Sequence, residues 1–94
     1  MSKIEKYQKE NYVSIGRALY ELMLPHCTNA DVSVPTVFTK EALEEALAFL
    51  CFNNIQHNYT AQPLKNYKGI SNILTLQWVE SSGAEKSICW FEKE

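Results

Sequence analysis

The stretch Leu76–Glu94, LQWVESSGAEKSICWFEKE, decides the fold, because apolar and polar residues alternate on both sides of a short turn sequence. Alternation with a period of two is typical of β-strands that bury one face. Between the two alternating runs, Ser-Ser-Gly-Ala at 81–84 supplies residues that favour turns. The stretch therefore predicts a hairpin with strands at 70–80 and 86–93.

Two registers of this hairpin are worth comparing. Pairing Val79 with Lys86 would set two glutamates directly opposite each other, which is unfavourable. Pairing Glu80 with Lys86 gives opposite charges and collects Trp78 and Trp90 on one apolar face. We therefore predict the second register, with both tryptophans in the core. The opposite, open face would then carry Thr75, Gln77, Val79, Ser87, Cys89 and Phe91.

A first helix is predicted over residues 3–23, where apolar residues recur at helical spacing. Ser2 and Glu5 form a capping box at its start. Pro25 should stop it, because the residue before a proline avoids helical dihedrals.

A second helix is predicted over residues 40–52, with Thr39 as its N-cap and Asn53–Asn54 at its end. Its second half, ALAFLCF, is apolar all round. A helix of that kind is normally buried, so we expect Cys51 to lie within the core.

The remaining segments complete the predicted sheet. Residues 55–62 alternate as a strand closed by Pro63. Residues 32–38 alternate too, but Pro35 cannot donate to a central ladder, so this segment is a candidate extra edge strand. The predicted fold class is α+β, with two helices packed on a three-stranded antiparallel sheet in the order α-α-β-β-β. A length of 94 residues predicts one domain, 1–94.

Composition narrows the function classes. The formal charge of −2 argues against a general nucleic-acid binder, which needs a basic surface to meet phosphates. No apolar run approaches a membrane span, and the charged start lacks the apolar stretch of a secretory signal. Three widely spaced cysteines make a poor disulfide framework, so reduced thiols in the cytoplasm are expected, with no membrane partner.

Catalytic and metal chemistry find little support in the sequence. No cysteine or histidine pair has the close spacing of a structural zinc site. There is no G-x-S-x-G motif and no phosphate-cradling glycine loop. We therefore expect no metal, no cofactor and no enzyme activity, and a small enzyme or metal protein is the second alternative. The residues whose side chains could bind a metal ion are His26, Cys27, Cys51, His57 and Cys89.

An acidic patch motivates the functional hypothesis. Glu41, Glu44 and Glu45 share one side of the second helix by their i, i+3, i+4 spacing. The sequence thus favours a small non-catalytic protein-binding domain that occludes a basic site on a protein partner, for which a nucleic-acid-handling protein is a candidate. It would act as an adaptor, or as an inhibitor or immunity factor of the kind that phages and bacteria make. Gln77 and Phe91, on the outer side of the hairpin, form the second candidate contact surface.

The alternative is a small nucleic-acid-binding module. Its candidate contacts are Lys65, Tyr67 and Lys68, a basic loop in which the tyrosine could stack on a base. Two lysines supply little positive charge for binding phosphates, so a nucleic-acid partner is not expected. The identity of the protein partner, and the choice between monomer and homodimer, stay open.

Overall fold

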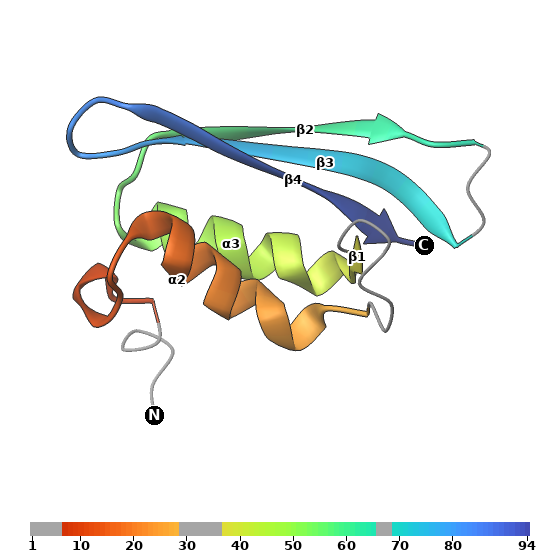
Figure 1. The fold of residues 1–94 in the computed structure, drawn as a ribbon, viewed down its shortest axis with the longest axis horizontal. Coiled ribbons are helices and arrows are strands. Elements are labelled where there is room, and N and C mark those ends of the chain that lie inside the picture. Colours follow the sequence, from red (N-terminus) through yellow and green to blue (C-terminus); the bar gives the residue numbers. More distant parts are fainter. Residues whose placement is uncertain (1–6, 29–36, 66–68) are drawn as a thin grey trace.

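The computed structural model describes residues 7–28, 37–65 and 69–94. Figure 1 shows two layers, a sheet on one side and the helices α2 (Ile15–Met23) and α3 (Lys40–Phe52) on the other. The α+β class is thereby confirmed. None of the described helices is long and apolar enough to span a membrane. The other elements are η1 (Lys9–Asn11), η2 (Leu24–His26), β1 (Val37–Phe38), β2 (His57–Pro63), β3 (Ile70–Val79) and β4 (Glu85–Lys93).

The sheet differs in detail from the predicted one. It has four strands in the order β1-β4-β3-β2, and β1 runs parallel to β4 while the other pairs are antiparallel. The three predicted strands do pair in antiparallel fashion, but the sheet as a whole is four-stranded and mixed, because the candidate edge strand is present at residues 37–38. Phe38 explains the extra strand, since its buried ring packs edge-on against Trp90 at 6.2 Å between ring centroids and holds β1 beside β4. The rest of the candidate edge strand, 32–36, lies outside the described residues.

The hairpin register is also corrected. Lys86 lies opposite Trp78 rather than opposite Glu80, a shift of two residues from the prediction. The turn causes the shift. Gly83 adopts φ +91° and donates its N–H to the Glu80 carbonyl, while the Glu80 N–H donates to the Ala84 carbonyl at 2.8 Å. A three-residue loop closed by a glycine in the left-handed region is a standard hairpin geometry, and it outweighs one charge pair.

A two-residue shift preserves which side chains share a face, whereas a one-residue shift would reverse them. Trp78 and Trp90 are accordingly both buried, each 4 % exposed, and the prediction that they lie in the core is confirmed. They are further apart than predicted, because Trp90 pairs with Leu74. Both tryptophans are therefore part of the core and do not form a binding surface.

Helix α2 is shorter than predicted. After the short 3-10 helix η1 the chain is extended at Tyr12, and the α-helix begins only at Ile15. The apolar spacing before residue 15 has another origin, since the Tyr12 ring packs edge-on against Phe49, 5.6 Å between centroids, from an extended backbone. The end at Met23 agrees with the prediction, but the predicted reason is wrong: Leu24, before Pro25, keeps helical dihedrals (φ −53°, ψ −41°), and the chain continues as the 3-10 helix η2. The predicted Ser2–Glu5 capping box lies outside the described residues.

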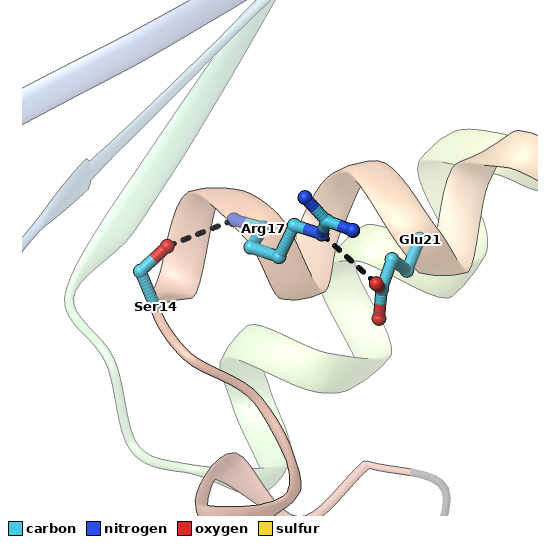
Figure 2. A network of polar contacts seen from close by, with 3 residues as sticks. All are labelled: Ser14, Arg17 and Glu21. Atoms are coloured by element: carbon cyan, nitrogen blue, oxygen red, sulfur yellow. Dashed lines mark hydrogen bonds and ion pairs between the residues drawn. The ribbon is translucent and has the colours of Figure 1, made fainter.

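Ser14 is the N-cap that the sequence reading missed. Its Oγ accepts a hydrogen bond from the Arg17 backbone N–H at 3.1 Å, as Figure 2 shows. Such a cap typically contributes about 1 kcal/mol to helix stability. One turn further, Arg17 Nε lies 2.9 Å from Glu21 Oε1 in an exposed ion pair, which contributes little in comparison.

Helix α3 has the predicted bounds, with Thr39 at the N-cap position and Asn53 at the C-cap. Its last turn differs from the prediction. Phe49 is fully buried, but Cys51 is exposed and Phe52 is 43 % exposed. A helix that covers one face of a single sheet can bury only the side that faces the sheet and α2, so the expected place of Cys51 in the core is wrong.

The space beside Gly16 in α2 shows how closely the helix layer packs on the sheet. A Cβ added there would lie 3.7 Å from Trp78 Cζ2, which is an ordinary van der Waals contact. Alanine restricts the unfolded chain and favours the helix, so Gly16→Ala should stabilise the fold by about 0.5–1 kcal/mol. Thermal or urea denaturation measures the change. A destabilised Gly16→Ala variant would mean that α2 lies closer to Trp78 than described.

Candidate functional site

The outer face of the sheet is turned away from α2 and α3, and neither helix covers it (Figure 1). The strand register extends the predicted hairpin face onto β2 and β1. Gln77 and Phe91 share this face, as the alternation predicted. The outer face comprises Val37, Asn58, Thr60, Gln62, Ile73, Thr75, Gln77, Val79, Ser87, Cys89 and Phe91, with the charged residues Glu85 and Lys93 at its two ends.

Charge is confined to the two ends of the outer face. In the described part of the chain, its charged neighbours on β4 are Glu85 at one end and Lys93 at the other. Between them lie hydroxyl, amide, thiol and apolar side chains. About one residue in five of the whole chain is charged (21 %), and on this face the charged residues lie at the two ends and not between them.

A hollow of about 190 Å³ lies at the Glu85 end of this face, around Gln77. Asn58, Gln77 and Ser87 are neighbours in the strand register and line it together, and Gln56 adds a third amide. The charged residues Glu85 and Lys86 line the hollow as well. Amide side chains present donors and acceptors side by side. Sequence reasoning identified Gln77 but not Asn58 or Gln56, because the pairing of β2 with β3 is a long-range contact.

The acidic side of α3 is only partly free. Glu41 and Glu44 are exposed, whereas Glu45 is half-buried. The Tyr7 hydroxyl donates a hydrogen bond to Glu45 Oε2, and His26 Nε2 lies 4.0 Å from Glu45 Oε1. Glu45 therefore ties two distant segments to α3, and an acidic contact surface would depend on Glu41 and Glu44. This contact surface stays a prediction.

Two pKa values follow from these contacts. Burial, and then the hydrogen bond to Glu45, raises the pKa of Tyr7 to about 12, so the phenol keeps its proton and remains a donor at neutral pH. The hydrogen bond with the Thr39 side chain lowers the pKa of Glu41, which stays ionised.

The basic loop is described only at its beginning. Lys65 is exposed in the connection between β2 and β3. Tyr67 and Lys68 lie outside the described residues, so the alternative nucleic-acid site also stays a prediction.

Cys51 and His57 form a pair that sequence reasoning missed. Cys51 Sγ lies 3.8 Å from His57 Nε2, and His57 Nδ1 lies 2.6 Å from the Ile55 carbonyl oxygen. None of the three cysteines forms a disulfide; Cys51 and Cys89 are exposed and Cys27 is half-buried. The described residues contain no group of three or more side chains suited to hold a metal ion.

The helix end brings the pair together. Asn54 adopts φ +55°, and the Ile55 N–H donates to the Leu50 carbonyl at 2.9 Å. This is a Schellman motif, which reverses the chain immediately after α3. The asparagine pair at 53–54 signalled the helix end, but the sequence did not show that the reversal returns His57 to the last turn.

Comparison with protein-family models, with curated proteins and with solved structures found no match for this chain. The functional argument therefore depends on the surfaces described above.

Proposed function

We propose that the chain is a small non-catalytic protein-binding domain that contacts its partner through the outer face of the sheet. The single observation that carries the proposal is the absence of charge on that face between Glu85 and Lys93, within the described residues. Charged residues are depleted at the centres of protein–protein interfaces. Solvent-facing surfaces, in contrast, are normally rich in charge.

The chemistry of the face favours a polypeptide partner. Nucleic acid presents phosphates that basic side chains must neutralise, and near the outer face there are only Lys93 at the far end and Lys86 in the hollow, beside the acidic Glu85. The hollow around Gln77 instead offers the amides of Gln56 and Asn58. Amide groups pair well with the donors and acceptors of a protein surface.

Occlusion is the mode of action that we propose. A rigid sheet face presents a preformed surface, so binding orders few side chains and costs little entropy. A domain of this kind can block a partner's surface, as an inhibitor does, or join two proteins, as an adaptor does. The acidic side of α3 is the second candidate contact, now reduced to Glu41 and Glu44.

Site-specific photo-cross-linking in the native cell tests the contact surface. A photoreactive phenylalanine analogue replaces Gln77 in one variant and Glu44 in a matched control, both at exposed positions. We expect one defined protein adduct from position 77 and none from position 44. The adducts are resolved by gel and identified by mass spectrometry.

Three results would contradict the proposal. A protein adduct from position 44 alone would favour the acidic helix side. A nucleic-acid adduct from position 77 would favour the binding-module alternative. No adduct from either position, in cells where the protein is folded, would mean that neither surface is a contact.

A further inference from the structure

The Cys51–His57 pair has the parts of an activated thiol. A carbonyl oxygen can only accept a hydrogen bond, so the 2.6 Å contact with Ile55 places the hydrogen of the neutral imidazole on Nδ1. Nε2 then carries the lone pair and faces Cys51 Sγ at 3.8 Å. The thiol thus has an adjacent base, and a third group orients that base, which is the arrangement that activates a nucleophile.

Access to the pair is open. Cys51 is exposed and His57 is half-buried at the first position of β2. The reactive sulfur can therefore meet a dissolved reagent while the imidazole stays fixed by its backbone contact.

Because of its position on α3, Cys51 depends on His57 for any raised reactivity. Cys51 is the residue before the last of the helix, and a helix C-terminus carries partial negative charge, which disfavours a thiolate. Exposure alone would therefore leave Cys51 no more reactive than an ordinary thiol. Any gain must come from the imidazole.

We propose that Cys51 is a thiol–disulfide exchange site, at which His57 is the base and low-molecular-weight disulfides are the reactants. His57 Nε2 takes the Sγ proton, and the thiolate attacks one sulfur of the disulfide. A bond forms between Cys51 Sγ and that sulfur as the original S–S bond breaks. The departing thiolate takes the proton from His57. Cys51 is thereby oxidised to a mixed disulfide, and the leaving sulfur is reduced to a thiol.

Cys89 is a matched control within the same chain. It is also exposed, but the group beside its sulfur is a hydroxyl: Thr75 Oγ1 donates to Cys89 Sγ at 3.7 Å. The two thiols share solvent, temperature and protein concentration in one reaction. Their rate ratio therefore cancels these shared conditions, and the change in that ratio when His57 is replaced isolates the effect of the imidazole.

The experiment treats the full chain with oxidised glutathione at pH 7 and measures the modification of Cys51 and Cys89 over time by peptide mass spectrometry. An ordinary thiol is only a few per cent ionised at this pH, so we expect Cys51 to react about tenfold faster than Cys89. His57→Gln should reduce the Cys51 rate to that of Cys89 or below and leave Cys89 unchanged. His26→Gln, which changes the other histidine, should leave the Cys51 to Cys89 ratio at its parent value.

Unchanged Cys89 rates and an unchanged melting temperature show that the His57→Gln variant is folded. If Cys51 and Cys89 react equally fast in the parent chain, or if His57→Gln leaves their ratio unchanged, His57 does not activate Cys51. A second substitution, His57→Asn, should reproduce the loss, and a Cys51 rate that survives both substitutions would overturn the assignment.

Discussion

Replacing Trp90 with alanine should lower the free energy of unfolding by about 3–5 kcal/mol, the range for deleting a buried large aromatic side chain. Trp90 is 4 % exposed and packs edge-on against Phe38, which itself holds β1 to the sheet. The free energy of unfolding of a protein domain is about 5–15 kcal/mol, so the variant should lose a large part of its stability. Urea denaturation followed by circular dichroism measures the loss.

Two further substitutions make this prediction specific. Phe52→Ala removes an aromatic that is 43 % exposed, and it should cost much less than Trp90→Ala. Trp90→Phe should also be milder, because it keeps a ring against Phe38. It also removes the indole N–H, which is buried without an acceptor among the described residues. Removing such a donor recovers part of the lost stability. A Trp90→Ala variant as stable as the parent would contradict the described core.

Hydrophobic alternation predicted which side chains share a face but not which residues pair. The faces follow from a period of two, which survives the two-residue error in register. The register itself depends on the loop that Gly83 closes, and the conformation of a turn is decided by backbone dihedrals rather than by charges on the strands. The core position of Trp78 and Trp90 was therefore predictable, and their partners were not.

The helices were likewise predictable only in part. The bounds of α3 were predictable because Thr39 and Asn53 flank an uninterrupted helical pattern. The start of α2 was not, because Tyr12 contributes an apolar ring from an extended backbone and imitates helical spacing. The side chain of Ser14 decides that start through one local hydrogen bond.

Of the candidate contacts, Gln77 and Phe91 were predictable as members of one face. The uncharged extent of that face was not, since Asn58 and Thr60 join it only through the pairing of β2 with β3. The Cys51–His57 contact was equally hidden, because it depends on the left-handed residue Asn54. Contacts that need a turn or a strand register lie beyond what spacing in the sequence can show.

The central claim, binding through the outer face, makes the second large prediction. Gln77→Glu keeps the shape of the side chain and adds one carboxylate to the proposed contact surface. If a partner covers that surface, the buried and unpaired charge should weaken binding by about 3 kcal/mol, or roughly 100-fold in Kd. The matched control is Glu44→Gln, the reverse isosteric change on the exposed acidic side of α3.

The decisive measurement is the Kd of both variants for the cross-linked partner by isothermal titration calorimetry, at low and at moderate salt. The outer-face account predicts a loss of roughly 100-fold for Gln77→Glu, and for Glu44→Gln an unchanged Kd with an unchanged salt dependence. A Gln77→Glu variant that binds like the parent, together with a Glu44→Gln variant that loses affinity and salt dependence, would contradict the account and assign the contact to the acidic helix.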